Sequence, residues 1–194
     1  MRAHWMLHEL SLPYETVPIK ARSGETQEVS YLDINPKGKI PTLVHEKFVL
    51  SEGFAILRYL SRLTGNPEKD SFQLSLEGQA IYDEWASFIL MELDAASLYV
   101  IRRHKDLGEI YGGSSEAVNS AEKYFEKMLV TACREIDFTG YLWGDRFSEI
   151  DILFTTVLDW AHFAGIKLEG KLVRYARRMH SRQAYRLAYD VNYA

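Results

Sequence analysis

The stretch that decides the fold is Asn35-Pro36-Lys37-Gly38-Lys39-Ile40-Pro41, followed ten residues later by Ser51-Glu52-Gly53-Phe54-Ala55-Ile56. Pro41 opens an apolar strand and has no backbone N–H to give to the ladder of a sheet. An X-Pro bond is the one peptide bond that adopts the cis form at low cost. A cis Ile40–Pro41 bond would turn the N–H and C=O of Ile40 outward, where they would pair with the backbone of a ligand. A trans bond would make Pro41 an ordinary strand start.

The second stretch is the end of a strand that runs into a helix. Ser51 is a residue type that caps helices, and Glu52 suits the first helical turn. With Ser51 as the N-cap, the N–H groups of residues 53 and 54 would face any carboxylate placed there. The alternative is a capped helix that binds nothing. Together the two stretches outline a pocket for a small peptide.

The composition limits the classes of function. The 194 residues are enough for one large or two small domains, and 47% of them are hydrophobic, so the chain can bury a core. A net charge of −4 argues against a nucleic-acid partner. No apolar stretch approaches the ~18 residues of a membrane span, so no membrane partner is expected. His8 and Glu9 lie where a signal peptide would be apolar, which favours a cytoplasmic location.

Neither a disulfide framework nor a metal site is expected. Cys133 is the single cysteine, which excludes an internal disulfide and a Cys-x-x-Cys pair, and it resembles a small buried apolar residue. His4 and His8 lie four residues apart on one helix but have no evident third ligand. His162, on an apolar helix, is interpreted as a core histidine.

The chain divides into two regions of different character. Residues 1–63 alternate helix and strand signals, residues 64–70 are polar and turn-rich like a linker, and residues 71–194 carry only helical signals. The pattern in the first region predicts helices over Ala3–Leu10 and Gly53–Leu63 and a short helix or turn over Glu28–Asn35. It also predicts an edge strand over Tyr14–Ile19 and a hairpin of Pro41–Val44 with Lys47–Leu50.

The second region is predicted to be an all-helical bundle. Apolar residues recur at spacings of three and four in three segments: Ile81, Trp85, Phe88 and Ile89; Tyr124, Met128 and Leu129; and Leu153, Val157, Trp160 and Ala164. Trp85 and Phe88 are expected in the core. Ser148-Glu149-Ile150-Asp151 is a capping-box-like helix start, in which Asp151 would reach back to the N–H of Ser148.

Five motifs in this order resemble the cytosolic glutathione S-transferases, in a bacterial-like style. Residues 2–15 resemble the first helix and its exit, residues 35–44 the cis-proline loop, and residues 50–60 the glutathione-binding turn. Residues 144–151 resemble the capping box of the bundle, and residues 181–185 the late Arg-Pro-Ala-Tyr stretch, with Gln183 in place of proline. The resemblance implies a thioredoxin-like domain over 1–63 followed by an all-helical C-terminal domain over 71–194.

The resemblance also implies the site and the partners. The backbone of Ile40 would pair with the cysteinyl unit of glutathione, Pro41 would be the cis residue, and Glu52 with the N–H of Gly53 would hold the γ-glutamyl end. Lys39 is a further candidate for a carboxylate contact. By position, Tyr99 and Arg102 are candidates for the pocket of the electrophile, the alternative being packing for Tyr99 and solvation for Arg102. Glutathione is the expected co-substrate, no metal is expected, and the family implies a homodimer and a role in detoxification.

Two departures from the family pattern matter. Gly53 stands where the family has a serine, so one hydroxyl is lost and weaker glutathione binding is expected. The family also begins with a β-strand and a loop that carries the activating Ser, Tyr or Cys, whereas this chain starts at the helix. We therefore expect Met1 to be an internal methionine of a longer protein, and the chain as given to be weak or inactive in conjugation.

The leading expectation is a glutathione transferase that adds the glutathione thiolate to small electrophiles. One alternative is glutathione-dependent reduction of disulfides or peroxides on the same scaffold. The other is a non-catalytic interaction domain, which Gly53 and the missing strand favour and which Ile40, Pro41 and Glu52 oppose.

Overall fold

The computed structural model describes residues 1–20, 23–64, 75–143 and 146–193. The chain separates into two compact units, Met1–Asp70 with Ala184–Ala194, and Ser71–Gln183. The elements of the first unit are α1 (Arg2–Glu9), η1 (Glu25–Gln27), α2 (Val29–Leu32), β1 (Thr42–His45), β2 (Phe48–Ser51), α3 (Gly53–Leu63) and, from the chain end, α10 (Gln183–Tyr193). Those of the second are α4 (Leu76–Phe88), η4 (Ile89–Leu98), α5 (Tyr99–Ile101), η5 (Arg102–Asp106), α6 (Gly108–Tyr111), α7 (Ser115–Glu135), α8 (Glu149–Phe163) and α9 (Lys171–His180).

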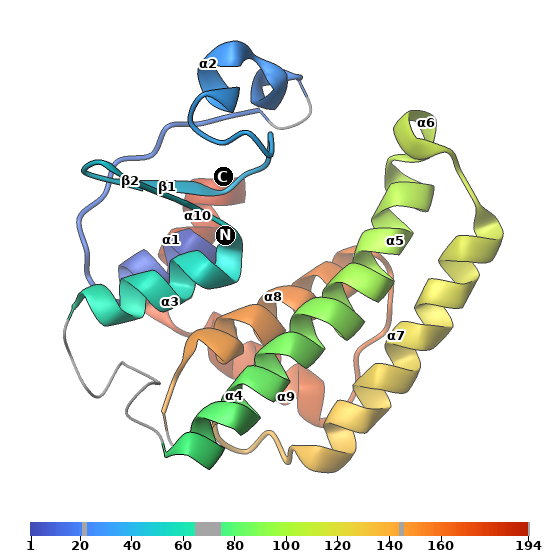
Figure 1. Ribbon diagram of the computed structural model, residues 1–194. Helices are drawn as coiled ribbons and strands as arrows, with labels where there is room; N and C mark the ends of the chain where they lie inside the picture. The colour runs from blue at the N-terminus through green and yellow to red at the C-terminus, as the bar shows by residue number, and fades with distance from the viewer. Residues whose placement is uncertain (21–22, 65–74, 144–145, 194) are drawn as a thin grey trace. The chain divides into compact units, whose positions relative to one another are not determined.

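The first unit is built on the predicted hairpin, which the structure confirms. β1 and β2 pair antiparallel, with Thr42 opposite Ser51 and His45 opposite Phe48 (Figure 1). Glu46 lies in the turn with φ 54°. The predicted helix over Gly53–Leu63 is also confirmed, and it buries Ile56, Leu57 and Leu60 as the spacing of these residues requires.

Two helices complete the core of this unit. α1 packs against α3, and Trp5 of α1 is fully buried. The Trp5 ring meets Tyr185 of α10 edge to face, with ring centroids 4.9 Å apart. α10 thus groups with residues 1–70, although its sequence position lies in the predicted range 71–194 of the helical domain. The domain boundaries 1–63 and 71–194 stay a prediction, and the predicted linker lies outside the described residues except for Thr64.

The strand predicted over Tyr14–Ile19 is wrong. These residues have no regular secondary structure, and within the described residues the sheet consists of β1 and β2 alone. A strand exists only where a neighbour completes its hydrogen-bond ladder, and Pro13 and Pro18 supply no N–H to one. The strand-like sequence pattern of this stretch is therefore not enough to form a strand, and the segment stays without regular structure.

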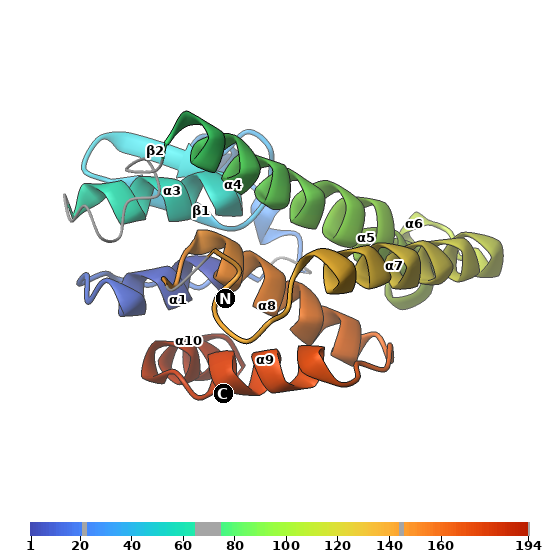
Figure 2. The same ribbon diagram turned by 90° about the horizontal axis from the view of Figure 1, so that it is seen from below.

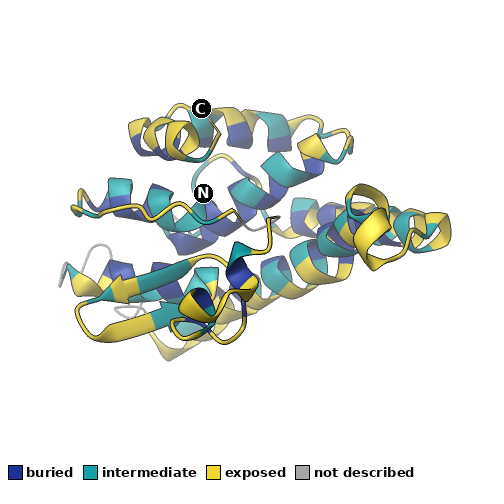
Figure 3. Cartoon of the chain, turned by 90° about the horizontal axis from the view of Figure 1, so that it is seen from above, coloured by how far each residue is buried: buried dark blue, intermediate teal, exposed yellow. Residues whose placement is uncertain are grey.

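The second unit contains one long helical run and three further long helices. The run α4–η4–α5–η5 lies antiparallel to α7, which it contacts through η4 and α5 (Figure 1). α8 contacts both the α4–η4 stretch and α9, and it lies between them (Figure 2). Ten of its fifteen residues are buried, and buried residues are dark blue in Figure 3. None of the described helices is both long and apolar enough to cross a membrane.

The start of α8 confirms the predicted capping box. Ser148 is the N-cap, and a side-chain oxygen of Asp151 accepts the N–H of Ser148 at 2.9 Å. The other oxygen of Asp151 accepts the N–H of Leu142 at 2.9 Å and the hydroxyl of Tyr175 at 2.8 Å. The carboxylate therefore joins the loop before α8 to α9 as well as capping the helix.

Four side chains in this unit are less buried than the sequence predicts. Ile81 is exposed, and Trp85 and Phe88 are half-buried rather than in the core. Tyr82 and Ala86 form the buried face of α4, because the helix is turned by one residue from the expected face. His162 is exposed as well, since the buried face of α8 ends at Ala161.

Candidate functional site

The loop before β1 has a shape that requires glycine at one position. Gly38 has φ +59°, and a Cβ added there would lie 2.5 Å from Nε2 of Gln27 and 3.0 Å from the carbonyl oxygen of Thr26. Thr26 is buried, so the backbone cannot move aside at low cost. The glycine lets the loop pass close over η1 and sets the path of the chain into Ile40 and Pro41.

The Ile40–Pro41 peptide bond is cis. The Ile40 side chain is 49% exposed. Within the described part of the chain, neither the N–H nor the C=O of Ile40 makes a hydrogen bond. Ile40 therefore presents one free backbone donor and one free acceptor at the surface of the unit.

The carbonyl before Ile40 is held from inside the unit. The Lys39 carbonyl oxygen accepts the Tyr31 hydroxyl at 2.7 Å and Nδ2 of Asn35 at 2.8 Å. Thr42, on the far side of Pro41, has its hydroxyl 2.9 Å from that of Tyr31 and 3.0 Å from Nδ2 of Asn35. Sequence reasoning included Asn35 in the loop motif but assigned it no role, and it missed Tyr31 and Thr42.

The start of α3 differs from the prediction by one residue. Ser51 pairs with Thr42 as the last residue of β2, so the turn into the helix falls on Glu52, which is the N-cap with φ 72° and ψ 118°. A positive φ at a residue other than glycine is uncommon and costs conformational energy. The Glu52 side chain makes no capping hydrogen bond to the helix. Within the described residues, the N–H groups of Gly53 and Phe54 have no acceptor.

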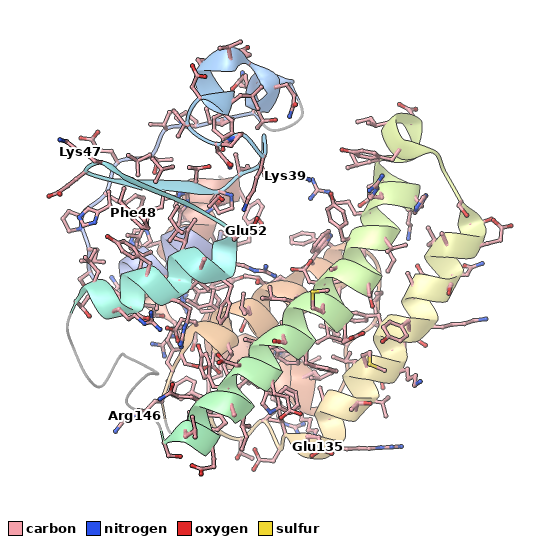
Figure 4. The ribbon with its side chains drawn as sticks, in the orientation of Figure 1. Lys39, Lys47, Phe48, Glu52, Glu135 and Arg146 are labelled. Atoms are coloured by element: carbon pink, nitrogen blue, oxygen red, sulfur yellow. The ribbon has the colours of Figure 1, made fainter. Side chains whose placement is uncertain are left out.

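An ion pair connects the loop with the start of α3. Nζ of Lys37 lies 2.7 Å from a carboxylate oxygen of Glu52, and both side chains are more than half exposed. Figure 4 places Lys39 and Glu52 at the same end of the hairpin, on the loop before β1 and at the start of α3. The structure thus brings Lys39, Ile40, Pro41, Glu52 and Gly53 to one edge of the first unit. Lys37 is an addition that sequence reasoning missed, because its contact spans 15 residues.

Gly53 has space for a side chain. A Cβ built there would lie 3.8 Å from Cδ of Arg2, which is an ordinary van der Waals contact, and the residue has no positive φ. Neither backbone strain nor crowding explains the glycine at this position.

Tyr99 and Arg102, the candidates for the electrophile pocket, belong to the second unit. They are three residues apart on the long helical run, so they share one face, and both are half-buried. The Arg102 guanidinium lies over the Trp160 ring of α8, 5.7 Å from its centroid. Among the described residues, no carboxylate pairs with Arg102. Tyr99 directly follows the π-helical stretch η4, and Arg102 is the first residue of the π-helical stretch η5; such stretches are frequent at functional sites.

The comparison with known families agrees with this geometry. The family model of the glutathione S-transferase N-terminal domain matches residues 1–62, which include the loop, the hairpin and α3. Glutathione S-transferase hmp2 of Hypomyces subiculosus is 29% identical over 154 residues, which are 75% of this chain and 70% of the relative. Glutathione S-transferase GstA of Escherichia coli O157:H7 is 28% identical over 155 residues, which are 78% of this chain and 73% of the relative.

Residues 1–62 thus match a glutathione S-transferase N-terminal domain, and the chain is similar to glutathione S-transferases over three quarters of its length. A ternary complex of BphK, a bacterial glutathione S-transferase, has a TM-score of 0.82 at 26% identity and covers 98% of this chain and 92% of its own. The beta-class enzyme of Sphingomonas chungbukensis has a TM-score of 0.80 at 24% identity over the same shares. The fold of the chain is accordingly a thioredoxin-like N-terminal domain followed by a helical C-terminal domain, as the sequence predicts.

Proposed function

We propose that this chain binds glutathione at the edge formed by the cis-proline loop and the start of α3, and that it adds the thiolate to small electrophiles. The observation that carries the proposal is the unpaired backbone of Ile40, at the same end of the hairpin as the uncapped start of α3. One donor and one acceptor on a single residue match the backbone of a peptide, as in strand addition. A transferase homologue from Sulfitobacter, similar in fold with a TM-score of 0.73 at 20% identity, was solved with bound glutathione.

The charges of the site residues suggest which end of the tripeptide binds at which residue. The γ-glutamyl end carries an ammonium and a carboxylate, and Glu52 with the N–H of Gly53 offers one partner for each. The dipole of the eleven-residue helix α3 adds attraction for the carboxylate. Lys39 is assigned to the other carboxylate of glutathione, on the glycine.

The ion pair between Lys37 and Glu52 does not block this arrangement. An exposed pair contributes about 0–1 kcal/mol, so the ammonium of glutathione can replace Lys37 at Glu52 with little loss. Before glutathione binds, the ion pair with Lys37 orients the Glu52 carboxylate toward the loop.

The second substrate is assigned to Tyr99 and Arg102. A free thiol has a pKa near ~8.5, so conjugation depends on a donor that stabilises the thiolate and on an electrophile held against it. Tyr99 supplies an aromatic ring with a hydroxyl, and Arg102 supplies a positive charge. We assign no residue of this chain to activation of the thiol.

An NMR titration tests the proposed site. Glutathione is expected to shift the amide signals of Ile40, Gly53 and Phe54. Cysteinylglycine, which lacks the γ-glutamyl unit, is expected to shift Ile40 while leaving Gly53 and Phe54 in place. If millimolar glutathione shifts no amide signal, or shifts only the signals of other residues, the proposed site is refuted. The transferase proposal is then refuted with it.

The reductase alternative shares the glutathione site and differs in its product. Conjugation yields a thioether, whereas reduction of a mixed disulfide yields oxidised glutathione. The free backbone of Ile40 argues against a domain that has given up ligand binding.

A further inference from the structure

We propose that Tyr31 and Asn35 are positioning residues for glutathione: by holding the Lys39 carbonyl they aim the N–H of Ile40 at the ligand. The inference rests on the proposed function, because it concerns the residue assigned to the cysteinyl unit. Neither side chain is assigned a contact with glutathione, so both act through the backbone of the loop.

The planarity of the peptide group makes the connection. The Lys39 carbonyl and the Ile40 N–H belong to one peptide unit, whose atoms lie in a plane. A hydrogen bond that fixes the direction of the carbonyl therefore fixes the direction of the N–H on its other side. Ile40 has no hydrogen bond of its own within the described residues that would do this.

The holding groups are buried and converge on one atom. Tyr31 is 7% exposed and Asn35 is 3% exposed, and both donate to the same Lys39 oxygen. Hydrogen bonds made by buried polar groups are costly to lose, because no water replaces the partner. Side chains on two sides of the carbonyl thus fix it more firmly than one donor would.

The same pair also holds the far side of the loop. The Thr42 hydroxyl lies within hydrogen-bond distance of both the Tyr31 hydroxyl and Nδ2 of Asn35. The side-chain oxygen Oδ1 of Asn35 accepts the N–H of Lys37 at 3.2 Å. Ile40 and Pro41 are therefore bracketed by two anchored residues while their own backbone stays free for a ligand.

The competing explanation is that the cluster only attaches α2 to the unit. Tyr31 is the one buried residue of this four-residue helix, while Val29 is exposed. A purely structural anchor would change stability but would leave the pairing between ligand and Ile40 unchanged. The experiment must therefore measure how the ligand is recognised.

The test compares two ligands by calorimetry: glutathione, and an analogue with a methylene group in place of the cysteinyl carbonyl, which has no acceptor at that point for the N–H of Ile40. Tyr31→Phe keeps the ring and removes the hydroxyl. Thr42→Val, similar in shape, removes the other hydroxyl and serves if Tyr31→Phe fails to fold. Tyr59→Phe is the matched control, since its hydroxyl bonds Nδ1 of His45 at 2.6 Å elsewhere in the unit.

We expect Tyr31→Phe and Thr42→Val to bind glutathione about three- to tenfold more weakly than the wild type, the effect of one lost hydrogen bond. We also expect the loss of the cysteinyl carbonyl to cost them less affinity than it costs the wild type or Tyr59→Phe. If the ratio of the two affinities is unchanged in both variants, the cluster is only a structural anchor and the inference is overturned. A wild-type chain that binds both ligands equally well would overturn it too, whereas one that does not bind glutathione would refute the proposed function itself.

Discussion

Gly53 is the residue of the proposed site at which this chain departs most clearly from the glutathione S-transferase pattern that it resembles. A serine hydroxyl there would add a donor beside the uncapped start of α3, and the structure leaves room for it. We predict that Gly53→Ser tightens glutathione binding by roughly 0.5–1.5 kcal/mol, measured by calorimetry. Gly53→Ala adds the same Cβ without the hydroxyl and should leave the affinity near that of the wild type. Equal affinities of the two variants would refute a role for the hydroxyl.

His4 links pH to the stability of the first unit. Its Nδ1 lies 2.9 Å from Nδ2 of Asn192 on α10, so the neutral ring accepts this bond. Burial lowers the pKa of His4 below its ordinary value of 6.5. The unfolded chain then binds the proton more readily than the folded chain, so stability is present above about pH 6.5 and is lost as the pH falls through that value.

The prediction for His4 is a smaller acid sensitivity once the ring is removed. Urea unfolding at pH 7.5 and 5.5 should show a larger loss of stability for the wild type than for His4→Gln, whose side-chain oxygen can still accept from Asn192. His162→Gln, at an exposed position, should behave like the wild type. If all three proteins lose the same stability between pH 7.5 and 5.5, His4 is not the cause of the acid sensitivity.

At the scale of the element, the start of α8 depends on one buried carboxylate. Asp151 accepts from Ser148, Leu142 and Tyr175, so its loss removes a helix cap and leaves buried donors unpaired. We predict that Asp151→Ala lowers the free energy of unfolding by roughly 2–4 kcal/mol, and that Ser148→Ala costs about 1 kcal/mol. Denaturant unfolding followed by circular dichroism measures both, and a loss for Asp151→Ala no larger than that for Ser148→Ala would contradict the assignment.

The long helical run of the second unit makes a prediction about the electrophile. Arg102 lies on Trp160 and pairs with no carboxylate within the described residues, so it can bind an anionic group beside a flat ring. We expect Arg102→Gln to lower kcat/KM about tenfold for electrophiles that carry a carboxylate and to change it little for neutral ones. Arg103→Gln, whose native guanidinium lies on Tyr111 instead, is the control. Equal losses for both kinds of electrophile would contradict this role of Arg102.

The elements that the sequence predicts correctly are those with local causes. The apolar spacing of α3 and the turn residues around Glu46 act within a few residues, so the helix and the hairpin could be assigned directly. The segment Tyr14–Ile19 could not, because a strand depends on a partner distant in sequence. The rotation of α4 that buries Tyr82 instead of Ile81 is likewise decided by the helices packed on it.

The candidate site divides in the same way. The loop motif identifies Ile40, Pro41 and Glu52, since proline and helix-start chemistry are visible in the sequence. The anchoring of Lys39 by Tyr31 could not be predicted, because it depends on how α2 lies against the loop. The placement of the N-cap at Glu52 follows from the register of β1 with β2, which fixes Ser51 in the ladder.

At the scale of the whole molecule, we assign separate tasks to the two units of the chain. The first unit presents a backbone edge and a helix start that suit a peptide with charged ends, and the second presents an arginine beside aromatic rings. Similarity to glutathione S-transferases supports transferase function in general, while the choice of electrophile is our proposal for the second unit. The two tasks can therefore be altered independently by substitution.

Calorimetric titration of glutathione into the wild-type chain, Glu52→Gln and Glu46→Gln tests the central claim most directly. Glu46 is exposed in the hairpin turn, away from the proposed site, and it controls for the loss of one negative charge. The account predicts saturable binding with one glutathione per chain, the same affinity for Glu46→Gln, and about tenfold weaker binding for Glu52→Gln, since a hydrogen bond to a charged group is lost. Absence of binding by the wild type, or equal binding by all three proteins, would contradict it.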